Sequence, residues 1–163
     1  MFRDMRRNKQ ALSAEDVNRI LSEGSSGVLA VAGDDGYPYA VPLSYYFENG
    51  KIYFHCAREG HKLDAILNNP KASFCVIGQD KVSPEEYTTH YQSVIAFGQV
   101  HVIEDDVQKL YAIRKLARKY APAESHEHED RAVSGEWNRL CMLEMSIEHV
   151  TGKEARELMV KRG

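Results

Sequence analysis

Long apolar runs are missing from this sequence of 163 residues. A membrane-spanning helix needs about 20 consecutive apolar residues, and no segment approaches that length. The first ten residues, MFRDMRRNKQ, are basic, but no apolar segment follows them, so the pattern does not predict a signal peptide. We therefore expect a cytoplasmic protein that does not interact with a membrane.

A strong charge of either sign is also missing. The net charge is -3 at pH 7, which gives no electrostatic reason to expect binding to a nucleic acid or to an anionic lipid surface. The sequence has no G-x-G-x-x-G stretch after a strand, and this argues against a built-in nicotinamide-binding domain. A small-molecule substrate remains the expected partner.

Cysteine is scarce, and its spacing does not predict a metal site. Cys56, Cys75 and Cys141 are an odd number of thiols, which favours free cysteines in a reducing compartment. The segment SHEHED at 125–130 holds two histidines, but it has no partner ligands at helical spacing and is typical of a solvated acidic loop. No metal ion is expected.

Short apolar segments separated by turn signals dominate what is present. Asn49-Gly50 predicts a tight hairpin, Pro38 and Pro42 predict an edge or bulged strand, and Gly98 predicts a bend. The helix at 105–120 carries an apolar stripe of Val107, Leu110, Ile113, Leu116, Ala117 and Tyr120. Strands are expected at 27–33, 37–48, 51–56, 71–79, 91–104 and 139–152, helices at 13–24, 63–69, 105–120 and 153–162, and a loop or broken helix at 122–137.

This order lacks the strand-helix alternation of a doubly wound parallel sheet. It favours a mainly β fold with peripheral helices, built as a six- to seven-stranded antiparallel Greek-key barrel. No linker or internal repeat divides the chain, so residues 1–163 are expected to form one domain.

The segment KIYFHCAREGHKL at 51–63 passes from the end of a strand to the start of a helix. A helix N-terminus presents unpaired N–H groups and a partial positive charge, which suit an anion. Gly60 permits close approach of the backbone, and Lys62, with His61 when protonated, adds charge. The alternative is an ordinary solvated helix cap.

Three segments together resemble a known family: GYPYAVPLSYYFENGKIYFHCAREGHKLDAILNNPKASFCV at 36–76, HYQSVIAFGQVHVIED at 90–105 and SIEHVTGKEA at 146–155. They are similar to the FMN-binding split-barrel proteins, relatives of pyridoxamine 5'-phosphate oxidase, and most of all to the 5-nitroimidazole resistance branch. The arginine-rich substrate-phosphate site of the oxidases proper has no match at 146–163, which argues against vitamin B6 oxidation.

The resemblance implies a homodimer that holds FMN between its subunits. It implies that the turn through Cys56, Ala57, His61 and Lys62 binds the FMN phosphate and that the strand at 39–46 lies along the flavin ring. The cofactor contacts that it implies further are Pro42, Leu43 and Ser44 on that strand, Ser93 and Val94 at the start of the long strand, and Trp137. For Trp137 the alternative is a residue that closes the barrel or the dimer interface.

The resemblance also places His55 beside the flavin ring, in a position implicated in electron transfer to a nitro group. A histidine there could pass a proton, or it could line the site without taking part in transfer. The expected function is that of an FMN-dependent oxidoreductase acting on a small oxidised aromatic such as a nitro compound. The alternatives are a non-catalytic module that stores flavin or senses redox state, and a haem-binding relative on the same barrel.

Overall fold

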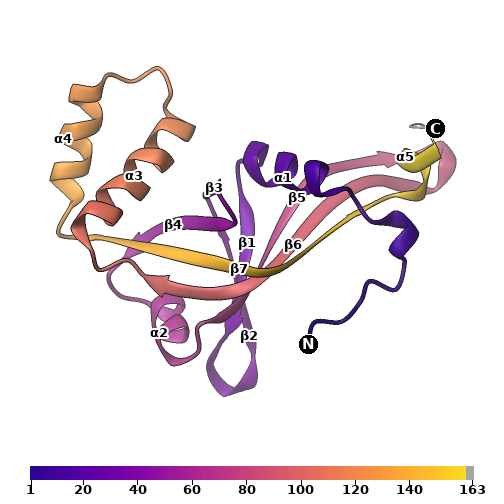
Figure 1. Ribbon diagram of the computed structural model, residues 1–163, viewed down its shortest axis with the longest axis horizontal. Helices are drawn as coiled ribbons and strands as arrows, with labels where there is room; N and C mark the ends of the chain where they lie inside the picture. Colours follow the sequence, from indigo (N-terminus) through magenta and orange to yellow (C-terminus); the bar gives the residue numbers. More distant parts are fainter. Residues whose placement is uncertain (161–163) are drawn as a thin grey trace.

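Seven antiparallel strands form one sheet in the order β2-β1-β5-β6-β7-β4-β3 (Figure 1). The computed structural model describes residues 1–160. The strands are β1 (Gly27–Ala32), β2 (Pro38–Leu43), β3 (Tyr46–Glu48), β4 (Lys51–Ala57), β5 (Lys71–Ser83), β6 (Thr88–Val102) and β7 (Leu140–Glu154). The helices are α1 (Ala14–Glu23), α2 (His61–Asn68), α3 (Asp106–Tyr120), α4 (His126–Glu136) and α5 (Arg156–Val160). The mainly β, antiparallel fold predicted from the sequence is confirmed.

The strand order shows that the sheet is rolled into a barrel. β2 and β3 stand at opposite ends of the order, yet only Ser44 and Tyr45 separate them in the chain. Two residues span roughly 10 Å from strand to strand, so the two edges of the sheet must come close together. The Tyr45 N–H donates to the Tyr120 hydroxyl at 2.9 Å, and Lys119 Nζ donates to the Tyr45 carbonyl at 3.0 Å, so α3 holds this crossing in place.

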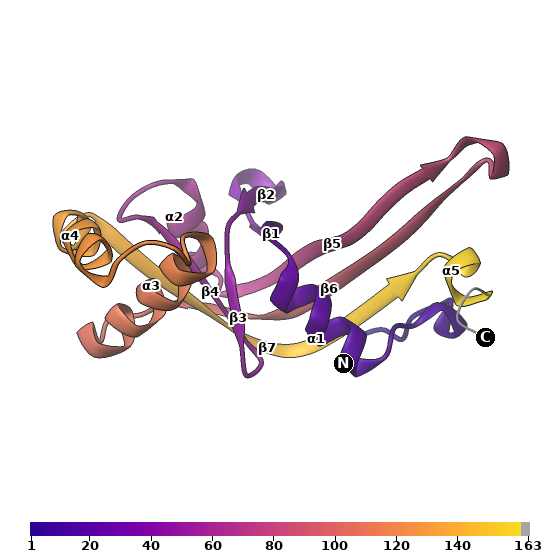
Figure 2. The ribbon, with the colours of Figure 1, turned by 90° about the horizontal axis from the view of Figure 1, so that it is seen from above.

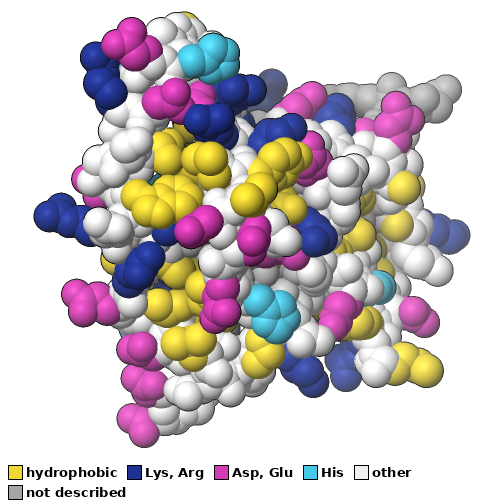
Figure 3. All heavy atoms as spheres, turned by 60° about the vertical axis from the view of Figure 1, so that its left-hand side comes forward, with side chains coloured by type: hydrophobic (Ala, Val, Ile, Leu, Met, Phe, Trp, Pro, Cys, Tyr) yellow, Lys and Arg dark blue, Asp and Glu magenta, His cyan; other side chains and the backbone are white. Residues whose placement is uncertain are grey.

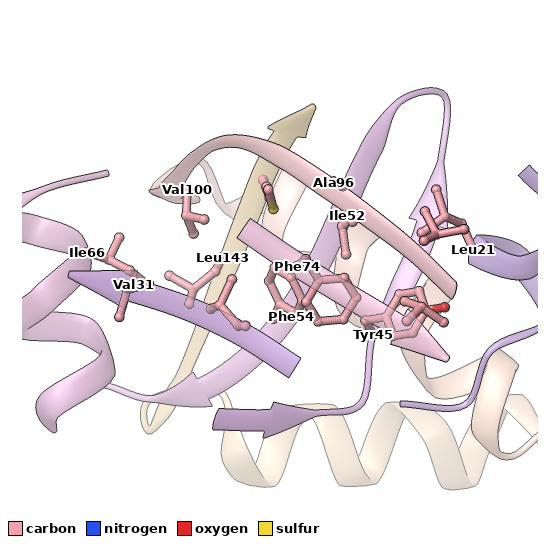
Figure 4. Packing of buried hydrophobic residues seen from close by; sticks show 14 of the residues in the cluster. Leu21, Val31, Tyr45, Ile52, Phe54, Ile66, Phe74, Ala96, Val100 and Leu143 are labelled. Atoms are coloured by element: carbon pink, nitrogen blue, oxygen red, sulfur yellow. The ribbon is translucent and has the colours of Figure 1, made fainter. Parts of the chain in front are cut away.

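Large apolar side chains fill the barrel (Figure 4). The Phe74 ring packs edge-on against Phe54 and Tyr45, with centroids 5.0 and 4.9 Å apart. All three residues are fully buried. Helix α1 adds Ile20 and Leu21 to the same cluster. Because interiors are packed as densely as organic crystals, this cluster fixes the curvature of the strands that carry the site.

Strands β5 and β6 extend beyond the barrel as a two-stranded arm, and Figure 2 shows the arm projecting from the sheet. The sequence predicted strands that ended at 79 and began at 91, with a polar loop between them. The ladder instead continues to Ser83↔Thr88 and turns through the short helix Pro84–Glu86. The bend predicted at Gly98 is confirmed, since the register shifts between Phe97 and Gly98.

Helices α3 and α4 form a separate hairpin at one end of the barrel (Figure 1). The sequence predicted a loop or broken helix at 122–137, but α4 is continuous over His126–Glu136. Arg114 of α3 pairs with Asp130 of α4 at 2.5 Å, and Arg118 pairs with Glu129 at 3.4 Å. These ion pairs join α4 to the preceding helix, and α4 itself buries only Val133.

Two further sequence expectations are corrected. On α3, Val107 is 77% exposed, whereas Lys109, Ala112 and Leu116 are buried, so the predicted stripe is displaced toward Lys109. The predicted terminal helix at 153–162 begins later, because β7 runs to Glu154 and α5 covers Arg156–Val160. The rest of that prediction, 161–162, lies outside the described residues. Within residues 1–160 no helix is both long and apolar enough to cross a membrane.

Candidate functional site

The passage from β4 to α2 is shaped by a glycine that no other residue replaces easily. Gly60 precedes the first residue of α2 and has φ 123° and ψ 163°. This is backbone that side-chain-bearing residues rarely adopt. A Cβ built on Gly60 would meet no atom within 4 Å. The backbone just before α2 is therefore open to anything that approaches from outside.

The N-terminus of α2 differs from those of the other long helices. Ser13, Asp105 and Ser125 each accept a hydrogen bond from a backbone N–H in the first turn of α1, α3 and α4. Gly60 has no side chain and gives α2 no such acceptor. The first N–H groups of a helix have no partner within the helix. In α2 the N–H groups of Leu63 and Asp64 donate to the Gly60 carbonyl at 2.9 and 3.1 Å, which leaves those of His61 and Lys62 to an external acceptor.

His61, the first residue of α2, is held by the turn between β1 and β2. Its ring packs on Tyr39 with centroids 4.1 Å apart, and its Nε2 lies 3.6 Å from a carboxylate oxygen of Asp34. A Cβ at Gly33 would come within 3.3 Å of the same nitrogen. The imidazole is thus fixed against the edge strand β2. Neither of these two contacts of His61 was predicted from the sequence.

Lys62 lies close enough to the end of β4 to influence two side chains there. Partial burial lowers the pKa of His55 below its usual 6.5, and the charge of Lys62 acts in the same direction. Burial raises the pKa of the Cys56 thiol to about 12, with Cys141 adding to the rise and Lys62 opposing it. The charge of Lys62 thus acts on both side chains. Because its pKa lies below 6.5, the His55 imidazole is mostly neutral at pH 7.

His55 and Cys56 leave β4 on opposite faces, as alternation along a strand requires. Cys56 packs against the barrel core together with Phe54, while His55 is exposed and stands opposite Met142 of β7. Ala57, the last residue of β4, is exposed as well. The structure thus brings His55, Cys56, Ala57 and Lys62 together and places His61 on the side nearer β2.

Pro42, Leu43 and Ser44 lie where the edge strand β2 ends and the chain crosses to β3. Pro42 and Ser44 are exposed, while Leu43 is half-buried and packs against the core. Pro42 stands opposite Val28 in the ladder with β1. β2 is an edge strand, as its prolines predicted.

Ser93 and Val94 start the barrel portion of β6. Ser93 is half-buried, whereas Val94 is fully buried in the core. Only the backbone of Val94 could face a bound molecule.

Trp137 follows α4 and packs, half-buried, against the small cluster of Tyr53, Ile103, Ala112, Leu140 and Met142. Its ring lies 4.0 Å from Lys109 Nζ, which donates to the Trp137 carbonyl at 3.0 Å. Within the single chain, Trp137 therefore packs into this second cluster between α3 and strands β4 and β7, apart from the core inside the barrel.

The outward face of the sheet is apolar over several strands. One row across the ladder consists of Pro42, Val28, Cys75 and Ile95. The next row consists of Ala40, Ala30, Ser73 and Phe97. A hollow of about 720 Å³ lies on this face, with Ala30, Ser73 and Phe97 among its lining residues and Phe2 over it. It reaches Gly33 beside His61 but is not lined by His55 or Lys62. Large contiguous apolar patches on a protein surface mark interaction or ligand sites, so this face is a candidate for one.

Charges on the end that carries α3 and α4 are of both signs and interspersed, as Figure 3 shows. The histidines of the SHEHED segment belong to α4, where His128 pairs with Glu124 at 2.8 Å. Among residues 1–160, no group of three or more His, Cys, Asp or Glu side chains is arranged to hold a metal ion.

Comparison with known proteins identifies the family. The sequence model described as pyridoxamine 5'-phosphate oxidase matches residues 13–154. No curated protein sequence matches this chain significantly.

Solved structures share the fold. A proposed 5-nitroimidazole antibiotic resistance protein of Bacteroides thetaiotaomicron has a TM-score of 0.76 at 22% identity, over 88% of this chain and 86% of that one. A FAD-binding protein of Mesorhizobium loti has a TM-score of 0.65 at 27% identity, over 89% and 96%. A FAD- and haem-binding protein of Mycobacterium smegmatis has a TM-score of 0.73 at 20% identity, over 94% and 80%. With a family match that spans most of its length and a barrel of the same kind, the chain belongs to the pyridoxamine 5'-phosphate oxidase family.

Proposed function

We propose that this protein binds FMN non-covalently and acts as a flavin-dependent oxidoreductase on a small oxidised aromatic, such as a nitro compound. Three findings support the proposal: the family membership, the structural likeness to a FAD-binding protein and the likeness to a nitroimidazole resistance protein. The observation that carries it is the N-terminus of α2, which has no side-chain cap and is flanked by His61 and Lys62.

A phosphate monoester fits this position on physical grounds. The N–H groups of His61 and Lys62 supply donors, and the helix dipole supplies a partial positive charge. Lys62 adds a full charge, and the open backbone at Gly60 permits close approach. In this proposal Lys62 and the first N–H groups of α2 bind the phosphate, and Tyr39 orients the His61 imidazole toward it.

The flavin ring needs an apolar wall with backbone groups at its rim. The end of β2 offers both. Pro42 and Leu43 are apolar, and Ser44, an exposed residue, carries backbone groups just after the strand. The outward sheet face beside it is apolar and includes Val28 and Ile95, which are 39% and 38% exposed. We propose that a second copy of the chain covers this face, so that FMN lies between two subunits and is shielded from water.

When bound, FMN would supply the hydride and electron chemistry of the reaction. The task left to the protein is to hold the cofactor and to manage protons. His55 is exposed at the end of β4 and neutral at pH 7. It can take a proton from solvent on one imidazole nitrogen and deliver it to an acceptor that gains electrons.

The test is the absorption spectrum of the purified protein, followed by mass spectrometry of what heat releases. Flavin bands with released FMN support the proposal. Released FAD would replace FMN as the cofactor, as in the Mesorhizobium loti protein. A Soret band without flavin would favour the haem-binding alternative. A colourless protein that does not take up added FMN would refute the proposal. Bound FMN without turnover of any nitroaromatic would leave a flavin-binding module.

A further inference from the structure

Two of the three cysteines face each other across a strand pair. Cys56 of β4 and Cys141 of β7 are direct partners in the antiparallel ladder. Directly opposed residues place their side chains on the same face, with Cβ atoms about 4.5–5.5 Å apart. Cα atoms of such partners lie about 4.5–5.5 Å apart, which is within the range of about 4.4–6.8 Å that a disulfide spans. Both cysteines are free in this structure, and a bridge requires their Cβ atoms to approach to about 3.5–4.5 Å.

We propose that Cys56 and Cys141 form a reversible cross-strand disulfide by exchange with a small-molecule disulfide. The Cys56 thiolate attacks one sulfur of the small disulfide and releases one thiolate. Cys141, after losing its proton, then attacks the Cys56 sulfur of the mixed disulfide and releases the second thiolate. The two protein thiols are oxidised, the small disulfide is reduced to two thiols, and two electrons and two protons pass between them.

The surroundings give a small reagent access to the pair. Cys56 is half-exposed, and Cys141 lines a hollow of about 360 Å³ together with Arg58 and Lys109. Lys62 also acts on Cys56. These cations favour the approach of an anionic disulfide, and Lys62 favours the thiolate form of Cys56. Burial works in the opposite direction by disfavouring the thiolate, so we expect slow exchange that reaches a defined equilibrium.

Cys75, the third cysteine, serves as an internal control for the specificity of bridge formation. It is half-buried like Cys56, but its ladder partners are Val28 and Ile95. It can form a mixed disulfide but not a bridge to either neighbour. The proposal concerns only the thiols at the β4–β7 pair and does not depend on whether the protein binds flavin.

The experiment equilibrates the folded protein with mixtures of oxidised and reduced glutathione until its mass is constant. It then quenches in acid, alkylates the free thiols and measures the intact and tryptic masses. Trypsin separates the three cysteines, because Cys56 falls in the peptide 52–58, Cys75 in 72–81 and Cys141 in 140–153. At the oxidising end we expect loss of two hydrogens, a cross-link between 52–58 and 140–153, and recovery of all three alkylations after dithiothreitol.

Variants test the assignment. Cys75→Ser should keep the bridge, whereas Cys141→Ser should abolish it and leave Cys56 free or glutathionylated. If Cys141→Ser does not fold, the wild-type peptide map decides alone. The proposal is overturned if neither 52–58 nor 140–153 carries a cross-link at any glutathione ratio, if the cross-link involves 72–81, or if the bridge forms only in urea-unfolded protein.

Discussion

The imidazole of His61 packs on the phenol ring of Tyr39, with the ring centroids 4.1 Å apart. This contact ties the first residue of α2 to the edge strand β2. It fixes the position of the proposed phosphate site relative to the end of β2, where we place the flavin ring. An aromatic pair of this kind contributes about 0.5–1.5 kcal/mol beyond its burial.

Tyr39→Leu should therefore raise the dissociation constant for FMN by about two- to ten-fold, which corresponds to that energy. Leucine keeps an apolar side chain against the core but removes the ring under His61. Fluorescence titration of FMN measures the change. Tyr87→Leu, at the exposed tip of the β5–β6 arm, serves as the control and should leave affinity unaltered. Equal affinities in wild type and Tyr39→Leu would show that His61 needs no such support.

His55→Gln should keep FMN bound but slow the oxidation of the reduced protein by a nitroaromatic, by about 100-fold if His55 delivers a proton. Stopped-flow mixing of chemically reduced protein with the acceptor measures this rate without a physiological electron donor. The pKa of His55 is lowered from 6.5, so its protonated fraction at pH 7 is small and grows as the pH falls. The wild-type rate should rise toward acidic pH, and the rise should vanish in His55→Gln. A parallel pH profile in both proteins would mean that His55 only lines the site.

Gly60→Ala and Gly135→Ala should have opposite effects on stability. A Cβ at either position meets no atom within 4 Å, so the backbone alone decides the sign. Gly60 has φ 123°, and alanine there should cost about 1–3 kcal/mol of unfolding free energy. Gly135 lies in α4, where alanine should add up to about 1 kcal/mol. Urea unfolding measures both; a neutral Gly60→Ala would contradict the backbone geometry assigned to the turn.

Ile95→Asp should dissociate the proposed dimer and weaken FMN binding, because it places a charge on the outward apolar face. Ile95 stands opposite Cys75 and is 38% exposed, so the substitution leaves the interior of the barrel intact. Light scattering reports the mass in solution. Val107→Asp, on exposed α3, should remain dimeric. If the wild-type protein is monomeric and still binds FMN tightly, the proposed dimer is not needed for FMN binding.

Local chemistry made much of the fold predictable from sequence. Asn49 and Gly50 both adopt positive φ, 51° and 74°, as a tight hairpin turn requires. The Ser13 cap of α1, which accepts from the Asp16 N–H, is equally local. Features that depend on contacts between separate helices and strands could not be predicted from the sequence. α4 pairs with Arg114 and Arg118 of α3, and the arm beyond Ile77 is joined by ladder pairing between β5 and β6.

The candidate site was predictable only in part. The resemblance and the turn chemistry pointed to Gly60, His61 and Lys62, which the structure places at the start of α2. The contact of His61 with Tyr39 and Asp34 depends on how β2 folds back beside α2, and no sequence spacing reveals it. The burial of Lys109 was missed because a lysine on a helix is normally exposed. Here the Trp137 ring and carbonyl compensate for its burial.

The most direct test of the central claim compares FMN with riboflavin, which lacks the phosphate, in calorimetric titrations of wild type and Lys62→Ala. A charge-assisted hydrogen bond contributes about 1.5–3 kcal/mol. We therefore predict that Lys62→Ala weakens FMN by about 10- to 150-fold and leaves riboflavin unchanged, while Lys81→Ala on the arm alters neither. If Lys62→Ala binds FMN as tightly as wild type, or loses FMN and riboflavin equally, the phosphate does not bind at the start of α2.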